Sequence, residues 1–275
     1  MKRFFILASI FCIFSYSGVA QGLRLGLTTA ITSDIILDNG IKSDPRYQAT
    51  FSHSFSPIGL NVSYDLTPSF GLSLETIMAN QQAVYEIIDI AEQVKGEHKL
   101  DMSMINVPVL LRFMSSGTSA TRFNFNVGPQ FSFITKAIES VAVQSGEFQI
   151  PDGASFEEIL QDYPTASQNS QQATDGTYEI SAAYYQDVLK KEANEFRNMN
   201  FQIALAMGLD IDVAKHFIVT TQIRANYSID GYRNEDAFND IISGNANQVF
   251  AEKANLNVGI QLGVQYSLNV TRSRR

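Results

Sequence analysis

The feature that most constrains this chain is an alternation of apolar and polar residues with a period of two. The segment from Leu256 to Leu268 shows it without interruption, because seven apolar residues alternate with Gly, Asn, Gln and Ser. Successive side chains of a β-strand point to opposite faces, and the spacing of a helix does not fit the same segment. This stretch therefore predicts a strand with one apolar face.

The same alternation recurs in seven other parts of the chain, so we predict eight strands. Each is nine residues or longer, which is enough to cross a bilayer at a tilt. Beyond residue 21 no apolar run approaches the ~20 residues that a membrane-spanning helix needs. The predicted strands are 23–31, 58–66, 70–78, 105–113, 123–133, 201–211, 217–227 and 256–268.

Short and long connections alternate between these strands. In an antiparallel meander, alternate connections lie at opposite ends, so all short turns share one end and all long loops share the other. An outer-membrane barrel has this arrangement, with short periplasmic turns and long extracellular loops. The short connections are Thr67–Ser69, Ser115–Ala120 and Ala214–His216, and the long ones are Ser33–His53, Asn80–Lys99, Ala137–Phe196 and Asp230–Ala254.

A soluble secreted β-sandwich or lipocalin-like barrel also shows eight alternating strands, so the chemistry of the two faces decides. The polar face carries glycines among Asn and Gln, which suits a narrow interior better than a solvent face. The apolar face carries aromatic residues near both strand ends, as at the two interfaces of a membrane. The glycines are Gly26, Gly59, Gly71, Gly128, Gly208, Gly259 and Gly263, and the aromatics are Tyr64, Phe70, Phe113, Phe123 and Phe217 at one end and Phe55, Phe133 and Tyr227 at the other.

We therefore predict an all-β protein, an eight-stranded antiparallel up-and-down transmembrane β-barrel with long extracellular loops that carry short helices. The predicted location is the outer membrane, with its lipid as a partner. Composition agrees with this reading. A mean hydropathy of −0.05 is what a lipid-facing set gives when it alternates with a polar interior. The net charge of −8 argues against nucleic acid as the main partner.

The N-terminal residues have the order of a secretory signal. Lys2 and Arg3 precede the apolar run 4–14, and small residues follow up to Ala20. We expect a signal peptide at 1–20 and a barrel domain at 21–275. The only cysteine, Cys12, lies in this signal, so the mature chain has no thiol for a disulfide or a zinc site.

Four strand motifs resemble those of the PorT-type outer-membrane β-barrel family of Bacteroidota. They are the segment Ile105–Phe113, the segment Phe125–Pro129 that follows it, the stretch Asn200–Asp210, and Ile223–Tyr227. The resemblance covers most of the mature chain apart from the long loops. It implies residence in the outer membrane, and the founding member of the family is associated with type IX secretion and gliding.

The parity of the strands places six charged residues on the inner face. Three cations and three anions in a confined lumen predict a salt-bridged plug, because an unpaired buried charge is strongly destabilising. We therefore expect a barrel that does not conduct. The alternatives are a proton or ion path and a small-solute channel. The six residues are Arg24, Arg112, Arg224, Asp65, Glu75 and Asp210.

The connection at about 137–196 contains eleven acidic residues and is far longer than an ordinary loop. Ser155 and Glu158 have the spacing of a helix-capping box, and apolar residues from Tyr184 to Phe196 recur at helical spacing. We predict short helices over the barrel mouth, with a weaker amphipathic turn at 236–242. The surface is interpreted either as a site for a protein partner or as a solvated cap. The loop lacks the tight Asp-rich motif of a specific calcium site.

A lipid-modifying enzyme at the barrel rim is the alternative function. His53 and His98 fall near the long-loop rim together with Ser and carboxylate residues, whereas His216 falls in a short turn. The chain contains neither a Gly-x-Ser-x-Gly elbow nor a His-Glu-x-x-His zinc helix. We therefore predict no enzyme, no catalytic or metal residues and no cofactor, and the sequence identifies no small-molecule substrate.

Overall fold

The computed structural model describes residues 22–38, 44–116, 119–162, 169–173, 175–234 and 253–268. The predicted signal peptide, Cys12 and the predicted turn at 236–242 lie outside these residues. Among the described residues, none of the helices combines the length and the apolar composition needed to cross a lipid bilayer.

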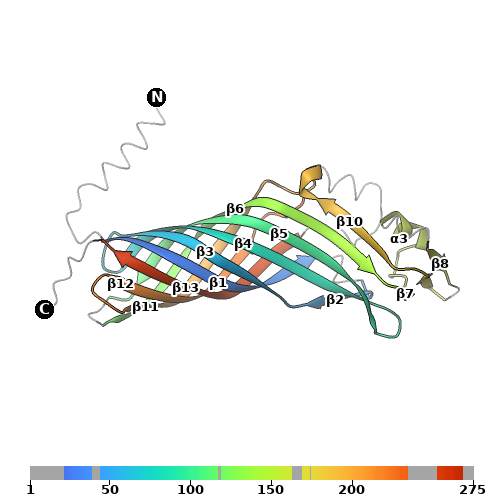
Figure 1. The fold of residues 1–275 in the computed structure, drawn as a ribbon, viewed down its shortest axis with the longest axis horizontal. Coiled ribbons are helices and arrows are strands. Elements are labelled where there is room, and N and C mark those ends of the chain that lie inside the picture. The colour runs from blue at the N-terminus through green and yellow to red at the C-terminus, as the bar shows by residue number, and fades with distance from the viewer. Residues whose placement is uncertain are drawn as a thin grey trace, which may run out of the picture.

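Eight long antiparallel strands form a closed ring (Figure 1). Each of the eight strands pairs with its two neighbours in the ring, and β1 closes the ring by pairing with both β3 and β13. Closure leaves no unpaired edge within the ring, and the predicted fold class is confirmed. The strands are β1 (Gly22–Asp38), β3 (Ser52–Asp65), β4 (Phe70–Ile88), β5 (Val94–Met114), β6 (Thr121–Val143), β11 (Met199–Asp212), β12 (Phe217–Ser228) and β13 (Lys253–Ser267).

The three predicted short turns share one end of the ring, which we call the turn end. The β3–β4 turn is held by Thr67, whose hydroxyl accepts hydrogen bonds from the amides of Ser69 and Phe70. The first strand begins and the last strand ends here, because Arg24 pairs with Ser267. All the long connections lie at the opposite end, which we call the loop end.

The prediction of a long loop over Asn80–Lys99 is wrong. Strands β4 and β5 continue to Ile88 and from Val94, and only the residues 89–93 connect them. The Asp89 carboxylate closes this turn by accepting the amides of Ala91 and Gln93. The sequence pattern missed these parts of the strands because, beyond Met78 toward the loop end, the apolar residues are on the inner face. The outward apolar residues that mark a membrane crossing end there, although the strands continue.

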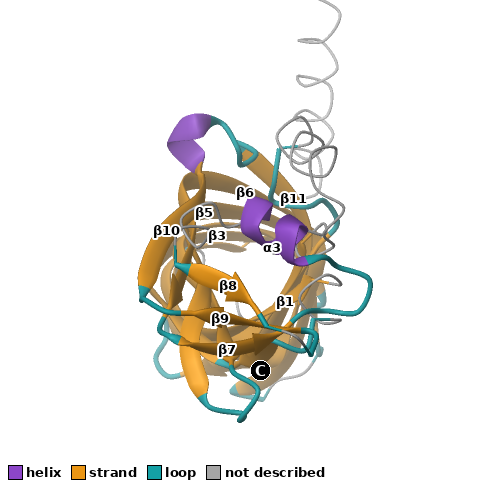
Figure 2. Cartoon of the chain, turned by 90° about the vertical axis from the view of Figure 1, so that its right-hand side faces the viewer, coloured by secondary structure: helices purple, strands orange, loops and turns teal. Residues whose placement is uncertain are grey.

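The connection Ala137–Phe196 is a folded structure. Strand β6 runs on to Val143, and a three-stranded sheet in the order β7-β9-β8 lies at the loop end with a short helix (Figure 2). Strand β10 extends the wall by pairing with β6, and β2 does the same on β4. The elements are β2 (Tyr47–Thr50), β7 (Gly146–Gln149), α3 (Phe156–Asp162), β8 (Ser170–Gln172), β9 (Thr177–Ile180), β10 (Tyr184–Lys190) and the 3₁₀ turn η2 (Lys191–Ala193).

The two helix predictions in this connection have different outcomes. The capping box is confirmed, because the Ser155 hydroxyl accepts the Glu158 amide and the Glu158 carboxylate accepts the Ser155 amide. The helical spacing over Tyr184–Phe196 is wrong. Tyr184–Lys190 is a strand, since its backbone joins the free edge of β6, and tertiary pairing outweighs a short local pattern.

Two regions follow from these elements. In the ring from the turn end to about Met78, Ile105 and Phe133, apolar side chains are exposed on the outside and polar ones fill the inside. We call this region the barrel. Beyond it the same strands, with β2, β10 and the cap of β7, β8, β9 and α3, enclose two apolar clusters. We call this region the extension.

Candidate functional site: the barrel lumen

Glycines on the inner face leave no room for a side chain beside the backbone of the adjacent strand. A Cβ atom at Gly128 would lie 2.0 Å from the Val109 carbonyl oxygen, and one at Gly208 would lie 1.9 Å from that of Thr221. A side chain at either position therefore requires the neighbouring strand to move. The space that remains is filled by long polar side chains from the other strands.

The first layer of charge lies near the turn end, around the fully buried Asp210 of β11. Its carboxylate accepts hydrogen bonds from Arg24 Nη1 at 3.2 Å and from Arg112 Nη2. Asn124 Nδ2 at 2.8 Å and the Thr220 hydroxyl at 3.0 Å bind the other carboxylate oxygen. Arg24 also donates to Asp65, so Arg24 bridges two carboxylates and Asp210 binds two cations.

The second layer lies further toward the loop end, where β4 faces β12 across the lumen. Arg224 Nη1 donates to Glu75 Oε2 at 2.6 Å. Gln261 Nε2 and Asn61 Nδ2 also donate hydrogen bonds to the Glu75 carboxylate, at 3.2 and 3.1 Å. Arg224 Nη2 also donates to Gln130 Oε1 at 3.1 Å. This pair is therefore held by amides from three further strands.

All six charged residues predicted for the lumen are thus located in these two layers. Five of them are less than 5% exposed, and Asp65 is at the turn end with a side chain that is 14% exposed. A buried pair of this kind is costly to desolvate, and removing one partner typically costs about 3–5 kcal/mol because the other charge stays buried. The layers therefore hold the lumen in one arrangement.

Within the polar interior of the ring, sequence reasoning missed two further buried charged residues, Arg122 and Asp34. Arg122 is buried at the turn end and donates to Asp212 at 2.8 Å. Asp34 is buried toward the loop end and accepts hydrogen bonds from Ser54 and Asn257. The parity of their strands was a sufficient signal, since Arg122 precedes the outward Phe123.

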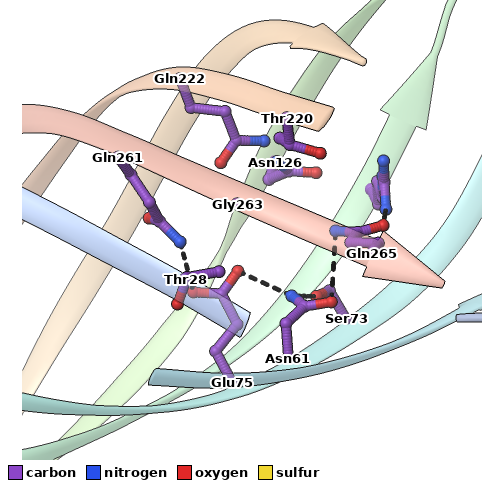
Figure 3. A pocket seen from close by; sticks show the side chains of 11 residues that line it. Thr28, Asn61, Ser73, Glu75, Asn126, Thr220, Gln222, Gln261, Gly263 and Gln265 are labelled. Atoms are coloured by element: carbon purple, nitrogen blue, oxygen red, sulfur yellow. Dashed lines mark hydrogen bonds between the residues drawn. The ribbon is translucent and has the colours of Figure 1, made fainter. Parts of the chain in front are cut away.

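Between the two layers lies a small cavity of about 10 Å³ (Figure 3). We call it the central cavity. Its walls include Arg112 of the first layer and Glu75 of the second. One buried water molecule needs about this volume, so the cavity is far too small for a hydrated ion or a nutrient molecule.

Toward the loop end an apolar cluster follows the polar lumen. The Tyr232 ring is fully buried in it together with Phe196 and Met104. The Tyr232 hydroxyl contacts the top of the polar region, where Gln202 Nε2 lies 3.3 Å away. The residue that follows, Arg233, donates to both oxygens of the buried Glu139 at 2.8 and 2.9 Å. The segment after β12 is therefore inserted into the mouth of the barrel.

The cap is joined to the wall by a second buried cluster. Arg46, which precedes β2, donates from Nη1 to the Tyr178 hydroxyl of β9 at 2.8 Å, and its guanidinium also binds Asp44 at 2.7 Å. Burial raises the pKa of Tyr178. Tyr178 and Phe148 are also buried in one apolar cluster with Ile87 and Val141 of the wall, so the cap is fixed to the wall by one charged and several apolar contacts.

The histidines of the alternative enzyme site do not come together. His53 is exposed on the outer face of β3, whereas His98 is buried inside the extension with Glu139 Oε1 at 2.6 Å from its Nε2. Glu97 points away from His98, because adjacent residues of a strand alternate in direction. His216 lies at the turn end, stacked on Tyr266 and 3.0 Å from the Ser267 carbonyl oxygen.

A closed antiparallel ring with an apolar exterior and a polar, packed interior defines an integral outer-membrane β-barrel. Residues 15–234 match the model of the family described as outer membrane protein beta-barrel domain, and the chain belongs to this family. The protein is located in the outer membrane. In this class the short turns are periplasmic and the long connections extracellular, so the extension stands outside the cell.

Solved structures with similar architecture are outer-membrane barrels of low sequence identity. OprG from Pseudomonas aeruginosa is 13% identical, with a TM-score of 0.41, 91% of this chain and 96% of that chain covered. Neisserial surface protein A is 9% identical, with a TM-score of 0.40 and coverages of 90% and 98%. Ail from Yersinia pestis is 9% identical, with a TM-score of 0.34 and coverages of 89% and 98%. No match was found among curated proteins.

Proposed function

We propose that this protein is a non-conducting anchor in the outer membrane that holds a folded cap at the cell surface for a protein partner. The observation that carries this proposal is the closure of the lumen by two ion-pair layers and then by the apolar cluster around Tyr232. A solute path requires all three to move. The long extracellular structure is then the part of the molecule available for function.

The charge of the cap supports a partner with a basic surface. The carboxylates of Glu147, Asp152, Glu157, Asp175 and Glu179 are all on exposed residues of the cap. Opposite charges across an interface speed association and favour the correct partner. The apolar side chains of the cap are turned inward, as Phe148 and Tyr178 are, so electrostatic attraction is the recognition that this surface offers.

Charge reversal tests the proposal better than deletion, because Phe148 and Tyr178 cover the apolar cluster of the wall. We expect Glu157→Lys, Asp175→Lys and Glu179→Lys together to abolish chemical cross-linking of a neighbouring protein in intact outer membranes. Lys215→Glu, in a periplasmic turn, is the matched control and should leave the cross-link unchanged. A cross-link of unchanged yield with the reversed cap contradicts the proposal.

The strand motifs that resemble PorT-type proteins of Bacteroidota support a narrower proposal, namely that the partner belongs to a type IX secretion or gliding apparatus. A strain without this chain should then lose secretion of proteins to the cell surface. Normal secretion and gliding in that strain rule out the narrower proposal and leave the anchor proposal intact. We propose no catalytic role, since the histidines at the loop end lie on opposite sides of the wall.

A further inference from the structure

Three of the residues that line the central cavity each carry a buried polar atom with no hydrogen-bond partner within the described part of the chain. These atoms are Thr28 Oγ1 of β1, Arg112 Nε of β5 and Asn126 Oδ1 of β6. All three residues are buried. The large majority of buried side-chain polar atoms are hydrogen-bonded in folded proteins, so three unpartnered atoms on residues around one small cavity point to a ligand in it.

Gly263 leaves room on the wall of the same cavity. A Cβ atom there would lie 3.2 Å from the Thr28 Cγ2 atom and 3.4 Å from the nearest backbone atom, the Leu27 carbonyl oxygen. At Gly259, on the same strand, the Cβ atom would lie 2.2 Å from the Ile31 carbonyl oxygen. Strand packing therefore requires glycine at 259 but not at 263. At 263 the missing side chain leaves the cavity open.

The charges around the cavity indicate which ligand it takes. A cation would lie beside the Arg112 guanidinium, and an anion would lie beside the Glu75 carboxylate, because both residues line the same 10 Å³. A neutral molecule avoids both repulsions. The volume is that of a single water, and buried waters typically make about three hydrogen bonds.

We propose that the central cavity is a binding site for one ordered water molecule between the two ion-pair layers. Arg112 Nε donates to the water oxygen, the water donates to Asn126 Oδ1, and the Thr28 hydroxyl takes a third hydrogen bond. The water gives these three polar atoms their hydrogen bonds. It is an integral part of the closed interior and not a segment of an open channel.

A high-resolution crystal structure of the full-length protein tests the site directly, with one crystal soaked in rubidium chloride and another in sodium bromide. We expect one density peak within hydrogen-bond distance of Arg112 Nε and Asn126 Oδ1, with no anomalous signal from either ion. A rubidium or bromide signal in the cavity overturns the proposal in favour of an ion site. A cavity without density overturns it as well.

Thermal unfolding of a variant tests the same site, because a water-filled cavity and a dry cavity predict opposite shifts of the unfolding temperature when the cavity is filled. Gly263→Ala is made in a Thr28→Ser background, because serine keeps the hydroxyl and removes the methyl group that crowds the new Cβ atom. We expect the double variant to unfold at a lower temperature than Thr28→Ser alone, since the new methyl group displaces the water and leaves polar atoms unpaired. If the cavity is dry, the double variant should unfold at a higher temperature. The new methyl group then fills an empty space, and alanine is more favourable than glycine within a strand. An unchanged or higher unfolding temperature overturns the proposal.

Discussion

Strands β4, β5 and β6 pass through both the barrel and the extension, and their two faces exchange chemistry between these regions. On β5 the outward residues change from apolar to polar at Ile105, and on β6 the inward residues change from polar to apolar beyond Ser132. Along β5 the direction of the side chains alternates without a break through both regions. In the barrel the outward set is Ile105, Val107, Val109, Leu111 and Phe113, and in the extension the inward set is Leu100, Met102 and Met104.

The comparison shows that one continuous sheet can be surrounded by lipid in one region and by water in another. Lipid surrounds the barrel and its buried groups are mainly polar, so specific pairing stabilises the interior. Water surrounds the extension and its buried groups are mainly apolar, so burial of apolar area stabilises it, as in a soluble protein. Strand pairing continues through the boundary, although a bulge in β6 near Thr135 interrupts the register with β5.

The largest effect is expected from breaking a buried pair in the barrel. Arg224→Met leaves the Glu75 carboxylate buried without its cation, and we expect it to lower the free energy of unfolding by about 3–5 kcal/mol. Urea unfolding in lipid vesicles measures this loss. Glu75→Gln with Arg224→Met removes both charges and should recover much of it. Equal losses in the single and double variants contradict a stabilising pair.

A cavity in the extension should have a similar but local effect. Met104→Ala removes a fully buried side chain from the apolar cluster and should destabilise the extension by about 2–5 kcal/mol. Hydrogen exchange of the β4–β5 hairpin amides detects this as faster exchange, while the amides of β12 stay protected. Ile105→Ala, on the next residue and facing lipid, is the matched control. Faster exchange throughout the ring shows that the two regions do not unfold separately.

The cost of placing a charge on the outer face should distinguish the lipid-exposed barrel from the water-exposed extension. Leu60→Arg, on the lipid face of β3, is expected to lower stability by about 2–4 kcal/mol, as lipid-facing arginines do near the midplane. Ser103→Arg, on the outer face of the extension, should change it by less than about 1 kcal/mol. Both values come from unfolding in vesicles. A similar penalty at both positions is evidence that the bilayer also covers the extension.

The smallest effect is expected in the cap. Ser155→Ala removes the hydroxyl that accepts the Glu158 amide, and the typical loss for such a cap is about 1 kcal/mol. Exchange of the Glu158 and Ile159 amides should quicken, whereas the ring should be unaffected. Gln171→Ala, on an exposed strand of the cap, is the control. No change in exchange means that this capping box does not stabilise α3.

The barrel could be predicted from the sequence because its rule is local. Alternation fixes strand direction, and the parity that puts Ile223 outside puts Arg224 inside. The partner of Arg224 could not be predicted, since Glu75 is brought to it by the closure of the ring and not by any spacing in the chain. The water site in the central cavity depends on the volume left at Gly263, which no pattern records.

The extension was missed for a physical reason. Leu100 and Met102 alternate with polar residues as regularly as the barrel residues do, but they point inward. The stretch is also shorter and less apolar than a membrane crossing. The strands predicted from the lipid-facing pattern were therefore too short. The strand at Tyr184–Lys190 was read as helical because its pairing with β6 comes from residues more than forty positions away.

The measurement that tests the closed lumen most directly is single-channel recording of the purified protein in a planar bilayer. With both ion-pair layers and the Tyr232 cluster in place, we expect no current steps above the baseline of the empty membrane across the usual range of voltages. Stable steps with the conductance of an open porin contradict a packed interior, and with it the assignment of this barrel as an anchor.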